Sequence, residues 1–255
     1  MTKRIESLKI VENNRLGKDI FILELTSAGR IPEMKPGQFV QVKVEGSPGT
    51  FLRRPFSIHD VNYSRNTFRL LIQIAGKGTE TLSRLSIGDT LNLIYPLGNS
   101  FSMPEKGEKI LLAGGGCGIA PLLFLGKYLK SNGFIPDILL GFRSSERVIE
   151  YDEYSGIGKV FLTTEDGSLG NKGFITEHPM LFANRYDLIY CCGPEPMMKA
   201  VIKYCRDNSI RCEVSLENLM GCGIGVCLCC VVETVRGNIC TCTEGPVFNI
   251  NDLKW

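Results

Sequence analysis

The sequence predicts a β-barrel, then an α/β domain built on a parallel sheet, and finally a small cysteine-rich module. Short apolar runs separated by turn residues fill the chain up to about residue 100, a pattern typical of antiparallel strands. Strand and helix patterns alternate from about residue 104. Six of the eleven cysteines lie between 222 and 242. We therefore expect domains over 1–102, 103–212 and 213–255.

The first domain contains four runs rich in Ile, Leu, Val and Phe. They are DIFILEL (19–25), QFVQVKV (38–44), TFRLLIQIA (67–75) and DTLNLIYPLG (89–98). Gly, Pro, Asn and Asp separate these runs and favour turns between them. Many short strands joined by turns indicate an antiparallel barrel.

Two segments of this barrel have features of anion-binding sites. FLRRPFSIHD (51–60) places Arg53 and Arg54 before Pro-Phe-Ser at the end of an expected strand. AGKGTETLSRL (75–85) is a glycine turn in which Thr79 could cap the following helix. A surface charge pair and a plain turn explain each segment equally well when it is taken alone. Together, beside a nucleotide-binding domain, they indicate a second phosphate-bearing cofactor.

The second domain alternates between strands and helices, as a parallel sheet with crossover helices requires. Strands are expected within 109–115, 137–144, 159–166 and 186–194, and helices within 121–133 and 195–208. In LLAGGGCGIAPLL a strand leads through glycines into a helix, so the backbone can approach a pyrophosphate there. The glycines concerned are Gly114, Gly115, Gly116 and Gly118. This position in an α/β unit favours a dinucleotide site.

Two further segments should face the same crevice. The turn at Cys192 and Gly193 follows another strand, and one of the adjacent Cys191 and Cys192 should point away because strand side chains alternate between faces. Filling of the core is the alternative role for this pair. Glu165 and Asp166 end a third strand, where carboxylates can accept from a ribose 2′-hydroxyl and repel a 2′-phosphate. The segment 161–170 has no arginine, so we expect NADH rather than NADPH. An ordinary acidic turn is the alternative.

Composition excludes several function classes. The net charge of +2 over 255 residues gives no electrostatic case for nucleic acid or an anionic membrane. Glycines and a proline interrupt the one long uncharged run, 110–126, which is short for a membrane span. MTKRIESLKI has no apolar core of signal-peptide length, so we expect a cytoplasmic protein. Its cysteines should then be reduced, and their clustering indicates metal or cluster ligation.

The spacing Cys222-x4-Cys227-x2-Cys230 matches that of plant-type [2Fe–2S] proteins, which need a fourth, more distant cysteine. Glycines at 221, 223 and 225 would let the loop curl and aim its amides at the sulfurs. Zinc is the alternative metal for these cysteines, but zinc sites usually use two separated C-x2-C pairs. Cys240 and Cys242 both suit the fourth position, and Cys229 should point away from the cluster.

Four motifs in the same order resemble the ferredoxin–NADP reductase superfamily over about residues 5–212: R-P-F-S, G-K-G-T, G-G-G-C-G-I-A-P and C-G-P-E-P-M. The resemblance implies that Arg54 and the amides of Gly78 and Thr79 bind the FAD pyrophosphate. It places Ser57 near the flavin N5 and Cys192 near the nicotinamide, as catalytic residues. The other implied flavin contacts are Pro55, Phe56, Leu71, Ile72 and Gln73.

The tail, LENLMGCGIGVCLCCVV followed by CTEGPVF, resembles the electron-transfer subunits of class 1B dihydroorotate dehydrogenases. In that family the final ligand directly precedes x-x-Gly-Pro-Val-Phe, which selects Cys242 and leaves Cys229 and Cys240 as extra cysteines. The resemblance implies a complex, with two of each subunit, in which an FMN-bearing partner oxidises dihydroorotate for pyrimidine biosynthesis. Electrons would pass through the [2Fe–2S] cluster and FAD to NAD+.

Such a reaction needs little acid–base chemistry from the protein, because hydride passes directly between nicotinamide and flavin. The two histidines, His59 and His178, are accordingly expected to be structural or surface residues. One alternative is an NAD(P)-linked flavoprotein subunit of a cytoplasmic hydrogenase or sulfur reductase. Another is a non-catalytic adaptor with the same fold, which the intact flavin motifs argue against.

Overall fold

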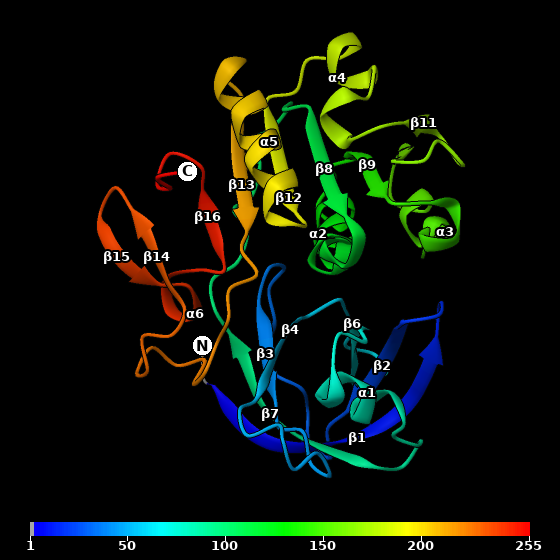
Figure 1. Ribbon diagram of the computed structural model, residues 1–255, viewed down its shortest axis with the longest axis vertical. Helices are drawn as coiled ribbons and strands as arrows, with labels where there is room; N and C mark the ends of the chain where they lie inside the picture. The colour runs from blue at the N-terminus through cyan, green and yellow to red at the C-terminus, as the bar shows by residue number, and fades with distance from the viewer. Residues whose placement is uncertain (1–2) are drawn as a thin grey trace.

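The computed structural model describes residues 3–255. Its N-terminal part is a seven-stranded antiparallel sheet with the order β4-β3-β7-β1-β2-β6-β5. Its strands are β1 (Arg4–Arg15), β2 (Ile20–Thr26), β3 (Phe39–Val42), β4 (Arg54–Ser57), β5 (Asp60–Asn62), β6 (Thr67–Gln73) and β7 (Thr90–Leu97). The sheet curls around a buried core that includes Leu8, Phe21 and Phe68 (Figure 1). The four predicted runs are confirmed as β2, β3, β6 and β7, whereas β1 was not predicted as a separate strand.

The second sheet has the order β11-β10-β9-β8-β12-β13-β16 and is parallel except for its last strand. Its strands are β8 (Ile110–Gly115), β9 (Asp137–Phe142), β10 (Val160–Thr164), β11 (Asn171–Lys172), β12 (Leu188–Cys192), β13 (Arg211–Ser215) and β16 (Val247–Asn249). The chain runs outward from β8 through β9 and β10, then returns to build β12 and β13 on the other side. This reversal creates a switch point between β8 and β12, where such sheets bind ligands.

Helices cover both faces of the parallel sheet. Side chains of α2 (Ala120–Ser131) and α3 (Tyr151–Ser155) pack on one face, and those of α4 (Met180–Ala183) and α5 (Glu195–Asp207) pack on the other. Short 3₁₀ turns complete the domain: η1 (Gly116–Ile119), η2 (Ser145–Arg147) and η3 (Ile175–Glu177). Cys192 belongs to the α2 side and Cys191 to the α5 side. Their predicted opposite orientation is confirmed.

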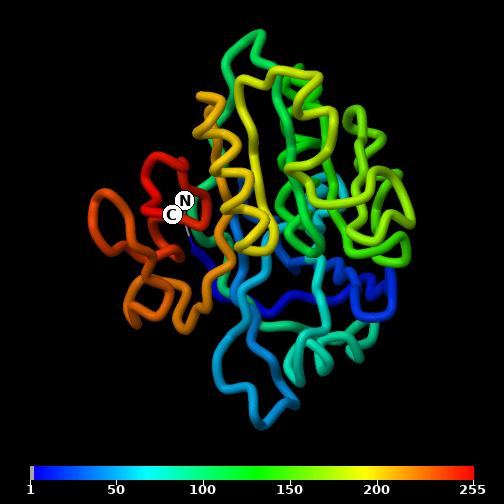
Figure 2. The backbone as a smooth tube through the Cα atoms, turned by 45° about the horizontal axis from the view of Figure 1, so that its top comes forward, coloured from blue at the N-terminus to red at the C-terminus, as the bar shows by residue number. Residues whose placement is uncertain are grey.

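The cysteine-rich module lies against both sheets (Figures 1 and 2). It consists of a hairpin, β14 (Val231–Thr234) and β15 (Gly237–Cys240), a turn of helix α6 (Thr241–Glu244), and β16, which pairs with the edge strand β13. On the barrel side, Cys230 and Cys242 pack against Phe39 and Leu97. Across the part of the chain that the structure describes, no helix has the length and hydrophobicity to cross a membrane.

A buried histidine joins the barrel to the nucleotide half. His59 follows β4, and its Nδ1 lies 2.8 Å from the carbonyl oxygen of Ala120 at the start of α2. Its Nε2 lies 2.7 Å from Oε2 of Glu150, although this ion pair lacks the alignment of a hydrogen bond. Both side chains are almost inaccessible to solvent. His59 is therefore structural, as expected, and so is His178, whose Nδ1 accepts from the Met180 amide.

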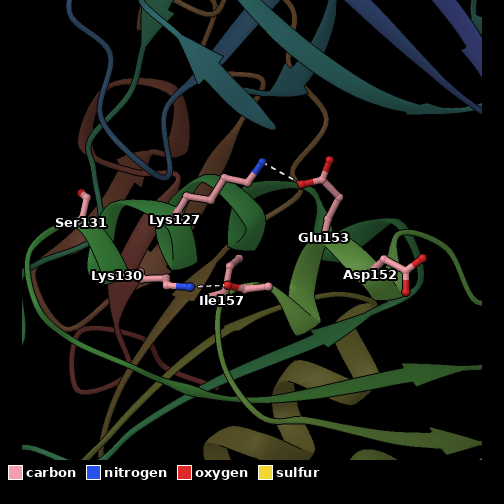
Figure 3. Close-up of a pocket in the computed structure, with 7 residues that line it drawn as sticks. Lys127, Lys130, Ser131, Asp152, Glu153 and Ile157 are labelled. Atoms are coloured by element: carbon pink, nitrogen blue, oxygen red, sulfur yellow. Dashed lines mark hydrogen bonds and ion pairs between the residues drawn. The ribbon is translucent and has the colours of Figure 1, made fainter.

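Charged side chains extend the same interface. Asp60 in the barrel contacts Arg69 at 2.6 Å and Lys127 of α2 at 2.8 Å. Figure 3 shows Lys127 reaching across a surface hollow between α2 and α3 to Glu153, at 2.8 Å. The lysines that line this hollow are thus already paired with protein oxygens, and the network fixes the two halves against each other.

Candidate functional site

The R-P-F-S motif, predicted at the end of a strand, forms the whole of the edge strand β4. Arg53 donates to the backbone oxygens of Gln41 and Asn92, so this arginine is structural. Arg54 is half-buried, and among residues 3–255 its side chain has no hydrogen-bond partner. Arg54 therefore has a guanidinium that is free to bind an anion, and its binding of the FAD pyrophosphate stays a prediction.

The second glycine turn leads into α1 (Lys77–Ser83), and Thr79 caps this helix from its third position rather than as the N-cap residue. Gly76 occupies the N-cap, and Thr79 stands three residues later, where its hydroxyl oxygen accepts from the amides of Ala75 and Gly76. The first helical bond runs from Glu80 to Gly76, which leaves the amides of 77–79 without helical partners. These amides, with Gly78 and Thr79 among them, can bind an anion.

At the end of β6, the side chains of three residues that were predicted to contact the flavin make other contacts. Leu71 belongs to the core between the two sheets, and Ile72 belongs to the barrel core. Gln73 is exposed and donates to Asp19 at 3.1 Å. A contact of Leu71 or Ile72 with a flavin would therefore come from the backbone.

The predicted nucleotide motifs meet at the switch point between β8 and β12. A Cβ atom placed on Gly118 would lie 2.3 Å from the Cα of Gly193, so only glycine allows the two turns to approach this closely. Gly114 and Gly115 end β8, and Gly116 follows in a left-handed conformation with φ 55°. Cys192 lies buried at the end of β12, beside the same turn.

A carboxylate that sequence reasoning missed, that of Glu217, influences two thiols of this region. Glu217 comes two residues after β13, and its side chain is accessible to solvent. Protein atoms nevertheless surround the carboxyl group, and this partial loss of solvent raises its pKa. Burial, and then the nearby Glu217 carboxylate, raise the pKa of Cys117 to about 12 and that of Cys192 well above its ordinary value. The Glu217 carboxylate thus acts on the pKa of both thiols, that of Cys117 in the glycine turn and that of Cys192 at the end of β12.

Glu165 and Asp166 are exposed at the end of β10, two strands away from the glycine turn that follows β8. The intervening strand β9 ends beside them, and the Asp166 amide donates to the carbonyl oxygen of Arg143 at 3.3 Å. The segment 161–170 contains no arginine, but the sheet brings Arg143 next to it. Pairing of the two strands expected within 137–144 and 159–166 would have indicated this residue as a neighbour.

The cysteine loop curls around its own sulfurs. The Sγ of Cys222 accepts from the amides of Ile224, Val226 and Cys227 at 3.3–3.4 Å. The Gly225 amide donates to Cys242 Sγ at 3.2 Å, which brings the sulfur of Cys242 to the same loop. Positive φ angles at Gly223 and Gly225 permit this curl, so the predicted role is confirmed for these two glycines, whereas Gly221 has no positive φ.

The thiols are arranged in pairs. Burial alone would raise the pKa of Cys222, but the loop amides and Cys227 outweigh it and lower that pKa to about 6. Burial and the adjacent Cys230 thiol raise the pKa of Cys242 to about 12. Within 3–255, no three His, Cys, Asp or Glu side chains converge as ligands of a single ion. Two thiol pairs joined by one loop, with amides directed at sulfur, fit a two-iron cluster.

The two extra cysteines differ in position. Cys229 is exposed, and no hydrogen bond connects it to the other cysteines of the described chain. Cys240 is half-buried, and burial followed by the neighbouring Cys230 thiol raises its pKa. Unlike Cys242, Cys240 receives no amide hydrogen bond at its sulfur in residues 3–255.

Comparison with known proteins identifies the family. The model of the iron-sulfur cluster binding domain of dihydroorotate dehydrogenase B matches residues 217–254, and an oxidoreductase FAD-binding domain matches residues 7–101. Dihydroorotate dehydrogenase B (NAD(+)), electron transfer subunit, of Caldanaerobacter subterraneus is 37% identical over 94% of each chain. The Clostridium perfringens protein of that name is 38% identical, again over 94% of each chain. The chain belongs to this electron transfer subunit family.

Two solved structures are similar to this chain. A structure of NADH-dependent reduced ferredoxin-NADP oxidoreductase aligns with a TM-score of 0.88 and 32% identity, covering 97% of this chain and 90% of that one. A ferredoxin reductase of carbazole 1,9a-dioxygenase aligns with a TM-score of 0.71 at 20% identity, covering 82% of this chain and 67% of that one. The second likeness establishes the fold. The predicted antiparallel and parallel sheets with a C-terminal iron–sulfur module are confirmed.

Proposed function

We propose that this family member carries electrons between a dihydroorotate-oxidising partner subunit and NAD+, through a [2Fe–2S] cluster and FAD. The observation that carries the proposal is the match to this family along nearly the whole chain, combined with amide-lined thiols packed on the barrel that bears R-P-F-S. When bound, FAD supplies hydride chemistry on one side and single-electron chemistry on the other, and the cluster supplies single electrons.

The barrel residues would hold and orient the FAD. Arg54 and the free amides of Gly78 and Thr79 would bind the pyrophosphate, while Pro55, Phe56, the β6 backbone and Ser57 would contact the flavin ring. Thr79 holds its turn through the amides of Ala75 and Gly76, which keeps the amides of the helix start directed outward. Such orientation is the main contribution of a protein to hydride transfer.

The parallel sheet would bind the nucleotide at the switch point. Gly114, Gly115, Gly116 and Gly118 would receive the pyrophosphate, and Cys192 and Gly193 would border the nicotinamide. We retain Glu165 and Asp166 as ribose contacts, with Arg143 now beside them. NAD is the nucleotide in the names of the relatives, which supports NADH over NADPH.

Cys222, Cys227, Cys230 and Cys242 would ligate the cluster, as two pairs. We further propose domains over 1–102, 103–212 and 213–255, the first two residues lying outside the described structure. The complex would contain two copies each of this chain and an FMN-bearing catalytic subunit, in the cytoplasm, where thiols stay reduced. The pathway served would be pyrimidine biosynthesis.

The deciding experiment is co-expression of this chain with a dihydroorotate-oxidising FMN subunit from the same genome. The purified complex should reduce NAD+ when dihydroorotate is added, and the FMN subunit alone should not. Size-exclusion chromatography with light scattering would give the subunit ratio. A complex that forms but leaves NAD+ oxidised would contradict the proposal.

The relative solved as NADH-dependent reduced ferredoxin-NADP oxidoreductase supports a second candidate, because it is 32% identical over nearly the whole chain. In that case the chain would serve a ferredoxin-linked pyridine nucleotide reductase. Affinity purification of the tagged chain from its native cells separates the candidates. Recovery of a dihydroorotate-oxidising FMN protein favours the first, and recovery of a ferredoxin-reducing flavoprotein favours the second.

A further inference from the structure

Gln41, in the middle of β3, carries a buried amide that has no hydrogen-bond partner. Its side chain is 0% exposed, and both Nε2 and Oε1 lack a partner within the described part of the chain. A buried polar group left unsatisfied costs about 1–3 kcal/mol. Native proteins rarely leave both ends of one amide in that state, so a bound group is expected at this position.

The direction of this side chain follows from strand alternation. Val40 and Val42 of β3 point into the barrel core, so Phe39 and Gln41 point to the opposite face. Phe39 packs there with the cysteines of the C-terminal module. Gln41 therefore faces the module rather than the barrel interior.

Gln41 contacts the cysteine loop itself. A Cβ atom built on Gly223 would lie 2.6 Å from Cγ of Gln41 and 2.9 Å from its Nε2. Gly223 has a φ of 71° and directly follows the proposed ligand Cys222. The loop that curls around the sulfurs thus rests on the Gln41 amide, and a side chain at position 223 would displace it.

The same strand also borders the flavin motif. Gln41 pairs with Pro55 of β4, and Phe39 pairs with Ser57. Gln41 accordingly lies between the strand that carries R-P-F-S and the loop that carries the thiols. Its amide contacts the loop at Gly223, next to Cys222, from the side on which β3 pairs with β4.

We propose that the Gln41 side-chain amide donates a hydrogen bond from Nε2 to a sulfur atom of the cluster, on the side facing the flavin, and thereby raises the reduction potential of the cluster. The proposal rests on the cluster assignment made above. A reduced cluster carries one more negative charge than an oxidised one, so a donor at sulfur stabilises the reduced form. Hydrogen bonds to sulfur are among the main determinants of these potentials.

The chain contains only three glutamines, Gln38, Gln41 and Gln73, which makes selective labelling informative. The full chain, purified with FAD and cluster, would be labelled with ¹⁵N at the glutamine side-chain amides and reduced. Pulsed EPR should detect a ¹⁵N coupling to the cluster, and Gln41→Leu should remove it. The midpoint potential should be highest in the wild type, lower in Gln41→Leu, and lowest in Gln41→Glu, which adds a negative charge.

Each result has a defined meaning. An intact cluster without ¹⁵N coupling, or an equal potential in all three proteins, overturns the proposal. A Gln41→Leu effect confined to the flavin spectrum overturns it too, because the amide would then serve FAD. If the variants fail to assemble a cluster, the labelled wild type still decides. A wild-type chain that never holds a [2Fe–2S] cluster refutes the proposed function instead.

Discussion

The substitution Gly118→Ala tests how the nucleotide crevice is built. Gly118 follows the glycine turn after β8, and Gly193 follows β12. An alanine Cβ at position 118 would lie 2.3 Å from the Cα and 2.5 Å from the amide nitrogen of Gly193. Both atoms belong to the backbone, so no side-chain rotation relieves the contact.

The size of the effect follows from these distances. Real Cβ contacts are essentially never under 3.0 Å, so the two turns must separate by about 1 Å. Overpacking of this kind costs about 1–3 kcal/mol of stability, and a 1 Å displacement can slow an aligned reaction by about 10²-fold. Gly115→Ala would be milder, because its 2.3 Å contact is with the flexible side chain of Met197.

The assay is rapid mixing of NADH with the FAD-loaded chain, following the loss of flavin absorbance. NADH should reduce the flavin at least tenfold more slowly in the Gly118→Ala variant than in the Gly115→Ala variant. The unfolding free energy of the Gly118→Ala variant should also fall by about 1–3 kcal/mol in a urea titration. Gly29→Ala is the control, since nothing lies within 4 Å of its added Cβ. If NADH reduces the flavin of the Gly118→Ala variant at the wild-type rate, the idea that both turns form one nucleotide site is refuted.

Three other predictions concern the cluster, the interface and the flavin turn. Cys242→Ser should abolish the visible absorbance and the EPR signal of the cluster while Cys240→Ser retains them; the reverse pattern would make Cys240 the ligand. For the interface, burial raises the pKa of the Asp60 carboxyl, but the contact with Lys127 outweighs burial and holds that pKa below 3.8. The contribution of the Asp60 carboxylate to stability is therefore present above pH 3.8 and is lost as the pH falls through its pKa in the folded protein. Asp60→Asn should cost about 2–3 kcal/mol at pH 7, and urea titrations should show this difference closing in acid; a constant difference would exclude the linkage. Thr79→Val removes the acceptor for two turn amides, so fluorescence titration should show FAD binding about tenfold weaker, and unchanged affinity would contradict the role of the turn.

Local pattern was sufficient for much of the fold. The apolar runs that became β2, β3, β6 and β7 are mostly buried, so their composition alone separated them from the turns. The opposite faces of Cys191 and Cys192 follow from the two-residue period of a strand, which needs no tertiary information. The glycine-assisted curl of the cysteine loop is equally local.

Features that depend on distant pairing could not be predicted in this way. β16 has only three residues, and it is a strand because β13 offers it an edge. Arg143 reaches the acidic segment only through the β9–β10 pair, and Glu217 comes near Cys192 because β13, which it follows, pairs with β12. The alternation of polar residues with valines in QVKV gives no sign that Gln41 is buried without a partner, since its burial depends on Gly223, far along the chain.

Strand β4 is the element at which the two electron transfers of the proposed function would meet. On one side Ser57 pairs with Phe39, whose ring packs against the module that holds Cys230 and Cys242. On the other side His59, two residues further along the chain, is tied to the start of α2 and to Glu150. If the cofactors bind as proposed, the cluster-to-flavin distance would be set by β3 and β4, and the nicotinamide-to-flavin distance would be set by the His59 contacts. Because different residues hold the two distances, substitutions on the outer face of β3 should alter the cluster without changing nucleotide binding, and substitutions at His59 should do the opposite.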